Sequence, residues 1–164
     1  MTEANDLLET ARKLMESQNY CTLITGGAAG SPNARVVQPL PLEADFTLWF
    51  GTSPRSRKVQ DIRHNPAITV LYFIAHGMSY ITLQGDAKLV DDLEQRKSRW
   101  AEGWHMFFPD GPEGDDYMLI QFTPKRIELM SFEHNITPPP FGLVPAVLTR
   151  QDDNWIVSEA YRHP

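Results

Sequence analysis

A serine-rich segment with three cations lies between an apolar run and a predicted helix. Its sequence, from Phe50 to Lys58, is FGTSPRSRK. The exposed N–H groups in the first turn of a helix attract anions, and arginine and lysine side chains add full positive charges. Ser53 or Ser56 can cap such a helix. The segment therefore predicts a phosphate-binding site, to which Arg57 and Lys58 would contribute charge.

The overall charge of the chain sets this basic segment apart. The 164 residues include 21 acidic and 15 basic side chains, which gives a formal net charge of -6 at pH 7. A nucleic-acid-binding surface carries a broad excess of positive charge, whereas these cations are clustered against an acidic background. The contrast favours a local phosphate site. The alternative is an ordinary solvated helix start with surface charges.

Length and composition predict one compact domain with a substantial core, since 41% of the residues are apolar and 22% are charged. The longest apolar run, Ala67 to Ala75, is about half as long as a membrane-spanning helix, and no charged leader with an apolar region opens the chain. We therefore expect a soluble cytoplasmic protein. The single cysteine, Cys21, is expected to be a small buried residue rather than a nucleophile.

Apolar spacing predicts the elements that must position the basic segment. Apolar residues recur at helical spacing over residues 2–18, and a short second helix is expected over 55–64. Gly85 marks a bulge or a close approach within a strand. Short apolar runs bounded by glycine, proline or aspartate predict strands over 20–25, 33–40, 46–50, 67–75, 78–90 and 117–132. Six antiparallel strands with flanking short helices predict a mainly β fold, in the form of a small closed barrel.

A third helix is expected to begin at Asp91 and Asp92, because Leu93, Trp100 and Trp104 fall at i, i+7 and i+11, near one helix face. Aromatic residues at this spacing usually pack in a core, which is the simpler interpretation of the two tryptophans.

The chain after residue 131 differs in composition from the part before it. We expect residues 1–131 to form the barrel domain and residues 132–164 to form an extension. Pro138 to Pro140 should be stiff and extended. The runs 146–150 and 155–158 could form a hairpin that packs on the barrel or on a partner chain.

Four segments together resemble a known family, the FMN-binding split barrels related to pyridoxamine 5'-phosphate oxidase, and in particular its general stress protein 26 branch. The resemblance covers roughly residues 5–131. The segments occur in the family's order and are Ala34–Val37, Phe50–Thr52 with Ser56–Lys58, Leu83–Ala87, and Trp104–Tyr117.

The resemblance implies a split barrel that forms a homodimer, with FMN at the subunit interface. Arg35, Arg57 and Lys58 would contact the FMN phosphate, and Ser56 belongs to the same motif. Backbone groups of Val36, Val37 and Gln38 would run along the flavin ring, with Gly51 and Thr52 near its polar edge. Tyr80 falls where the family's partner chain reaches the flavin, and Trp104 lies in a region that could cover the site from across the dimer.

The chain departs from the oxidases at the positions that hold the phosphate of their substrate. The tyrosine and arginine that the oxidases carry on the helix after the glycine-containing strand fall here at about Ser98 and Glu102, and the lysine that follows their arginine-bearing strand falls at about Leu40. A carboxylate at Glu102 would repel a phosphate. The expected function is therefore a small-molecule oxidoreductase acting through FMN, and not a vitamin B6 oxidase.

Several alternatives remain open on the sequence alone. Arg35 could pair with Glu43 or Asp45 across a hairpin, and Tyr80 could line the barrel. The protein could bind or sense a flavin without turnover, or it could use heme or a deazaflavin, since related barrels host each. Heme would need an axial ligand such as His76 or His105. The five histidines are too scattered to predict a metal site, and no motif identifies a catalytic residue.

Overall fold

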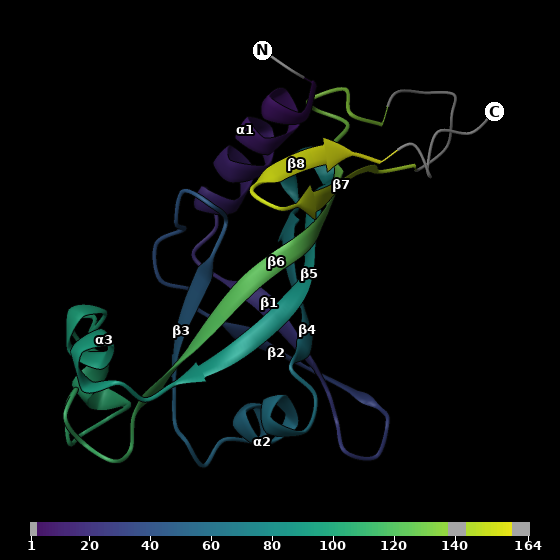
Figure 1. Cartoon of the computed structure of the whole chain (residues 1–164). Coiled ribbons are helices and arrows are strands. Elements are labelled where there is room, and N and C mark those ends of the chain that lie inside the picture. The colour runs from purple at the N-terminus through teal and green to yellow at the C-terminus, as the bar shows by residue number, and fades with distance from the viewer. Residues whose placement is uncertain (1–2, 138–143, 159–164) are drawn as a thin grey trace.

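The computed structural model describes residues 3–137 and 144–158. The helices are α1 (Glu3–Glu16), α2 (Arg57–His64) and α3 (Leu93–Ser98), with short 3-10 turns η1 (His76–Met78) and η2 (Trp104–Met106). The strands are β1 (Cys21–Gly26), β2 (Pro32–Val37), β3 (Leu48–Thr52), β4 (Ala67–Ile74), β5 (Ser79–Val90), β6 (Met118–Met130), β7 (Ala146–Gln151) and β8 (Asn154–Val157). In Figure 1, α1 and the β7–β8 hairpin lie at one end of the strands and α2 lies at the other.

The eight described strands form one antiparallel sheet, in which seven follow the order β2-β1-β4-β5-β6-β7-β8 and β3 joins beside β6. Strand β3 pairs with the first part of β6, whereas β7 pairs with its second part. The prediction of a mainly β, antiparallel fold with short flanking helices is confirmed. The strand count of six was too low, because the runs near 146–151 and 154–157 form β7 and β8 and extend the sheet from β6. The predicted stiff segment Pro138 to Pro140 lies outside the described residues.

The sheet stays open between β2 and β3. Among the described strands, β2 pairs with β1 alone, so its outer edge keeps backbone N–H and C=O groups that no other strand takes. Just beyond β2, the Leu40 N–H donates to the Trp49 carbonyl at 2.8 Å. The split barrel is therefore confirmed, and the closed barrel suggested by strand order alone is wrong.

Gly85 lies at the irregularity that the sequence predicts. The register of β5 and β6 shifts between Gln84 and Gly85, because Gln84 pairs with Arg126 and Gly85 pairs with Pro124. A Cβ at Gly85 would lie 2.1 Å from the Thr123 carbonyl oxygen, closer than any side chain allows. Glycine is required here because the backbone of β6 approaches the strand directly.

The main core fills the space between the sheet and α1. Side chains alternate between buried and partly exposed along β1, as expected for a strand with one face toward a core. The core also holds Ala11, Leu14 and Met15 of α1, which confirms the amphipathic first helix. Cys21 is buried in this cluster, and burial raises the pKa of its thiol to about 12. The thiol is therefore protonated at neutral pH and packs as an apolar group.

A second cluster gathers aromatic rings beside β3 and β6, around Tyr117. Trp100 and Trp104 both contact Tyr117 edge to face, with ring centroids 5.0 and 5.7 Å away. The predicted helix face of Leu93, Trp100 and Trp104 is wrong, because α3 ends at Ser98 and Leu93 is 47% exposed. The chain turns through Gly103, whose φ of 87° favours glycine, and the tryptophans meet through ring packing rather than helical periodicity.

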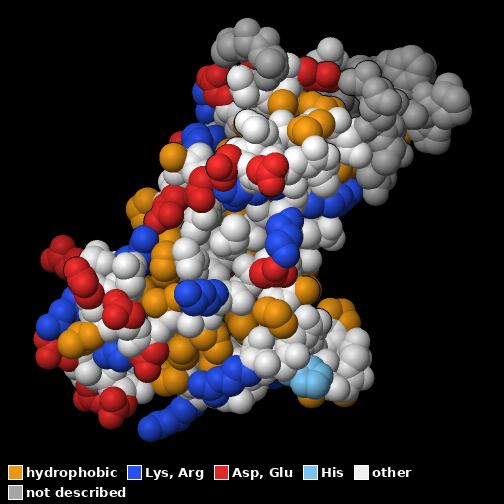
Figure 2. Space-filling model, viewed as in Figure 1, with side chains coloured by type: hydrophobic (Ala, Val, Ile, Leu, Met, Phe, Trp, Pro, Cys, Tyr) orange, Lys and Arg blue, Asp and Glu red, His pale blue; other side chains and the backbone are white. Residues whose placement is uncertain are grey.

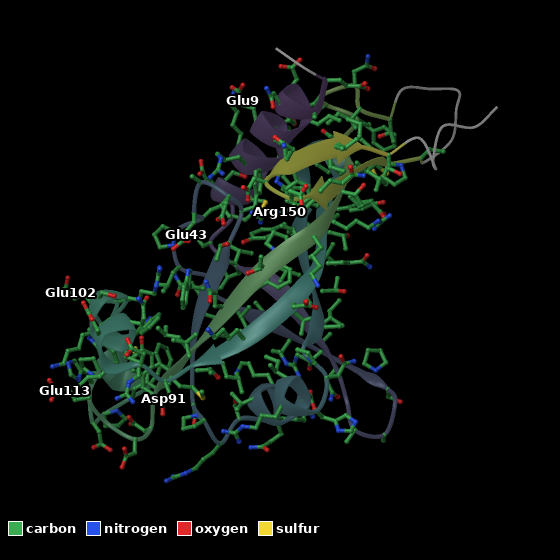
Figure 3. The ribbon with its side chains drawn as sticks, in the orientation of Figure 1. Glu9, Glu43, Asp91, Glu102, Glu113 and Arg150 are labelled. Carbon is green, nitrogen blue, oxygen red and sulfur yellow. The ribbon has the colours of Figure 1, made fainter. Side chains whose placement is uncertain are left out.

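Glu43 ties the α3 region to the loop before β3. Its carboxylate accepts a hydrogen bond from the Trp49 indole N–H at 2.9 Å and forms an ion pair with Arg99 at 2.8 Å. The Arg99 guanidinium also lies over the Trp49 ring, 3.7 Å from its centroid. In Figure 3, Glu43 lies between the lobe of α3 and the end of the molecule that carries α1. One carboxylate thus connects two segments far apart in the sequence.

Within residues 3–137 and 144–158, none of the helices is both long enough and apolar enough to span a membrane.

Candidate functional site

The start of α2 leaves the predicted phosphate-binding segment open. Ser56 occupies the N-cap position, but within the described residues its side chain makes no capping hydrogen bond. Its hydroxyl lies instead 3.1 Å from the Thr52 hydroxyl, and the Ser53 hydroxyl accepts from the Arg55 N–H at 3.3 Å. The Val59 N–H donates to the Ser56 carbonyl at 3.1 Å, so the first-turn N–H groups that can face an anion are those of Arg57 and Lys58.

Arg35 projects from β2 toward α2, where it joins a buried polar network. Its guanidinium donates to the Thr25 hydroxyl at 2.7 Å and lies 3.4 Å from the Asp61 carboxylate. The alternative pairing of Arg35 with Glu43 or Asp45 is wrong. Those carboxylates already have partners, because Glu43 binds Trp49 and Arg99, and Asp45 accepts from the N–H and hydroxyl of Thr47.

Asp61 holds this network together, and sequence reasoning missed it. Its carboxylate accepts from the Thr25 hydroxyl at 2.6 Å and from the Asn33 amide at 3.0 Å, in addition to pairing with Arg35. These hydrogen bonds, the one from Thr25 above all, hold the pKa of Asp61 below its usual range. The feature of the sequence that could have indicated this role is an acidic residue between the buried apolar positions Val59 and Ile62 of α2.

Three cations are close enough to influence one another at the α2 end of β2. Burial lowers the pKa of Arg35, an effect that Asp61 opposes and the positive charge of Arg57 reinforces. Burial also lowers the pKa of Lys58, and the nearby charge of Arg35 lowers it further. Figure 2 shows lysine and arginine side chains beside apolar surface along this lower edge of the molecule. A dianion bound there would relieve the mutual repulsion of the three side chains.

The residues after Arg35 continue along the unpaired edge of β2. Val36 is 70% exposed, Val37 packs partly against the core, and Gln38 is exposed just beyond the end of the strand. An edge strand offers backbone donors and acceptors on one side, and its apolar side chains limit the access of water. The arrangement fits a flat polar ring with a phosphate near Arg35.

Gly51 and Thr52 form the end of β3 and lead into the loop before α2. Thr52 is buried, whereas Gly51 lies against the indole ring of Trp104 in the same chain. A Cβ at Gly51 would come within 2.6 Å of that ring. Trp104 therefore covers the end of β3 from within its own subunit, as part of the aromatic cluster.

Tyr80 lies apart from the other predicted site residues. It belongs to β5, and β1 and β4 separate that strand from β2. Its hydroxyl donates to the Glu128 carboxylate at 3.1 Å, and burial, followed by Glu128, raises its pKa to about 12. Within one subunit the structure therefore brings together the phosphate and ring residues but not Tyr80.

We expect Asp61→Asn to destabilise the protein by about 1–3 kcal/mol at pH 7, because the variant loses hydrogen bonds to a charged acceptor. The folded pKa of Asp61 is lowered, so its carboxylate stabilises the fold above the unfolded pKa and ceases to do so as pH falls through the folded value. The difference between wild type and variant should be complete at pH 7 and shrink below about pH 4. Urea unfolding at several pH values measures it, and a pH-independent difference would contradict this role.

Neither a metal site nor a catalytic side chain emerges from the described part of the chain. No group of three or more histidine, cysteine, aspartate or glutamate side chains converges there. His76 lies exposed in η1, and His105 packs its ring against Trp100 at 5.1 Å. The residues gathered at the start of α2 and along the edge of β2 can hold a phosphorylated, planar group.

Two curated proteins share sequence with this chain. General stress protein 26 of Bacillus subtilis (strain 168) is 25% identical over 89 residues, which cover 52% of this chain and 63% of that protein. The pyridoxine/pyridoxamine 5'-phosphate oxidase of Cupriavidus metallidurans is 33% identical over 86 residues, which cover 52% of this chain and 40% of the oxidase. The matches therefore span less than two thirds of either relative.

Comparison with solved structures and family models agrees with the fold. A pyridoxamine 5'-phosphate oxidase-related, FMN-binding protein from Nostoc punctiforme has a TM-score of 0.68 at 16% identity, covering 96% of this chain and 97% of that one. The model of the family described as pyridoxamine 5'-phosphate oxidase like matches residues 6–154. The split barrel, the order of its motifs and this match over most of the chain lead to one conclusion: the protein belongs to the pyridoxamine 5'-phosphate oxidase-like family.

Proposed function

We propose that this protein binds FMN and acts as a small-molecule oxidoreductase of the general stress protein 26 type. The observation that carries the proposal is the convergence of Arg35, Arg57 and Lys58 at the open start of α2, next to the unpaired edge of β2. A flavin mononucleotide needs these two features side by side, because it joins a phosphate to a flat polar ring.

The residues of this chain would divide the binding between them. The three cations and the Ser56 segment would hold the phosphate, with Asp61 orienting Arg35. Backbone groups from Val36 to Gln38 would run along the ring, and Gly51 and Thr52 would lie near its polar edge. Bound FMN would supply an electron carrier able to exchange a hydride or single electrons, and the protein would supply position and electrostatics.

We further propose that the working form is a homodimer with FMN at the subunit interface. The outer face of the sheet around β2, β1 and β4 exposes apolar side chains, with Val36 70% and Phe73 64% exposed. A second copy could cover this face and the flavin edge at once. It would also account for Tyr80, which would reach the flavin of the partner rather than that of its own subunit.

Vitamin B6 oxidation is not part of this proposal, although one relative carries that activity in its name. Leu40 and Glu102 stand about where the oxidases are expected to hold the substrate's phosphate with cations. Loss of two cations and gain of a carboxylate would disfavour a phosphorylated substrate. The phosphate held by this chain would then be that of the cofactor.

Absorbance spectroscopy tests cofactor binding directly. Purified protein, or protein mixed with FMN and desalted, should be yellow and should show flavin absorbance. The double variant Arg57→Ala, Lys58→Ala should raise the Kd for FMN by about 100-fold, since each charge-assisted contact contributes about 1.5 kcal/mol or more. Arg63→Ala, at the far end of the same helix, is the matched control and should bind FMN normally.

The outcome decides between three kinds of protein. A wild-type chain that stays colourless with excess FMN would refute the proposal, and a Soret band would indicate heme instead. If FMN binds, its reduction by NADH or NADPH should be faster than that of free FMN. Equal rates would favour a flavin-binding protein without turnover.

A further inference from the structure

An open cavity of about 670 Å³ lies beside the proposed flavin site. One wall comes from the end of α1 and the loop that follows β2, and the other comes from the segment around η2. Buried Leu48 and Tyr72 also line it. Apolar and aromatic side chains dominate the lining, and they include Met15, Leu40, Leu42, Trp104, Met106 and Phe107.

The cavity shares two residues with the proposed flavin site. Gln38 lies at the end of the strand edge that would carry the ring, and Trp104 packs on Gly51 at the end of β3. A molecule in the cavity would therefore lie next to a ring bound along β2. This position is the reason to regard the cavity as a substrate site, and in that respect the inference rests on the proposed function.

The charged side chains that line the cavity are acidic. Glu16 and Glu102 line it, whereas no lysine or arginine does so among the described residues. Arg12 partly offsets Glu16 at 3.4 Å. Glu102 is exposed and makes no ion pair within residues 3–137 and 144–158, and Figure 3 shows it on the α3 lobe, at the end nearer to α1. Among the charged residues that line the cavity, Glu102 is thus the one without a paired cation in the described part of the chain.

We propose that this cavity binds an aromatic organic cation, and that it discriminates against aromatic anions of the same size. The apolar walls and the rings of Trp104 and Phe107 favour a flat hydrophobic body and can face a positive charge. The Glu102 carboxylate adds a Coulombic preference for a protonated amine and repels carboxylates and phosphates. The substrate class assigned to the protein is therefore aromatic amines in their cationic form.

A matched set of naphthalene compounds tests the charge preference without requiring turnover. 1-Naphthylmethylamine is a cation at pH 7, 1-naphthalenemethanol is neutral and 1-naphthoate is an anion. Calorimetric titration of the full chain with each compound, with and without FMN, gives three affinities. The amine should bind at least about tenfold more tightly than naphthoate, and the alcohol should fall between them.

Two substitutions locate the preference in the cavity. Glu102→Gln should weaken amine binding about fivefold and leave the alcohol unchanged, since it removes one partly solvated charge. Leu40→Lys should make naphthoate bind more tightly than the amine, because it places a cation in the cavity wall. Glu94→Gln on α3 removes the same charge outside the cavity and should change none of the affinities.

Each result has a distinct meaning. Naphthoate binding as tightly as the amine, or a Glu102→Gln variant with unchanged selectivity, would overturn the proposal. So would the absence of binding by all three compounds, as expected if a second copy of the chain filled the cavity. If the amine binds selectively but absorbance shows no FMN, the cavity assignment stands as a binding site and the flavin function fails.

Discussion

Replacing Arg35 with alanine is expected to weaken FMN binding about 100-fold and to destabilise the fold by about 2 kcal/mol. Both effects come from one side chain. Arg35 would contact the cofactor phosphate, and its guanidinium also pairs with Asp61, whose side chain is only 7% exposed. Removing Arg35 leaves that buried carboxylate with the Thr25 and Asn33 hydrogen bonds alone. Fluorescence titration with FMN and urea unfolding measure the two losses separately.

A double variant separates the binding role of Arg35 from its structural role. Arg35→Met combined with Asp61→Asn removes both charges and keeps similar side-chain volumes. The double variant should therefore regain most of the free energy of unfolding that Arg35→Ala loses. FMN affinity should stay low, because the phosphate contact is still missing. Recovery of FMN affinity in the double variant would mean that Arg35 acts only by satisfying Asp61.

Gly85→Ala should destabilise the protein by about 3 kcal/mol or more, the largest loss expected from a single methyl group in this fold. The new Cβ would lie 2.1 Å from the Thr123 carbonyl oxygen and 2.8 Å from the Pro124 Cα. These are backbone atoms of β6, so relief requires separating the two long central strands. Urea unfolding followed by tryptophan fluorescence measures the effect.

Gly30→Ala is the matched control for this substitution. Gly30 has a φ of 86°, but no heavy atom would lie within 4 Å of an added Cβ. Gly30→Ala should therefore lower the free energy of unfolding by about 1 kcal/mol, from backbone conformation alone. If the two variants lost equal free energy of unfolding, a steric clash at position 85 would not explain the need for glycine there.

The sequence predicted those parts of the structure that depend on local pattern. Alternating apolar residues indicated the strands, and the glycine at position 85 indicated the bulge, since both signals lie within a few residues. The basic segment before α2 was found in the same way. These features form the open edge of β2 and the start of α2, which together make most of the candidate site.

Features that depend on contacts distant in sequence were missed or assigned wrongly. Asp61 is 36 residues from Thr25 and 26 from Arg35, and a helix pattern gives no sign that these side chains meet. Trp100 and Trp104 fit a helical period by chance, although their rings gather around Tyr117. The closed barrel was also wrong, because strand order alone does not say whether the first and last strands pair.

The contacts of Glu43 connect the two walls of the cavity, which bears on how the cavity could change during evolution. Its carboxylate joins Trp49, next to the loop that forms one wall of the cavity, to Arg99, which leads into the segment that forms the other wall. The spacing of the two walls therefore depends on a residue that contacts the aromatic cluster through Trp49 but lies outside the cation cluster. Under the proposed function, a substitution at position 43 would change which substrates the cavity admits and leave the cofactor-binding residues in place.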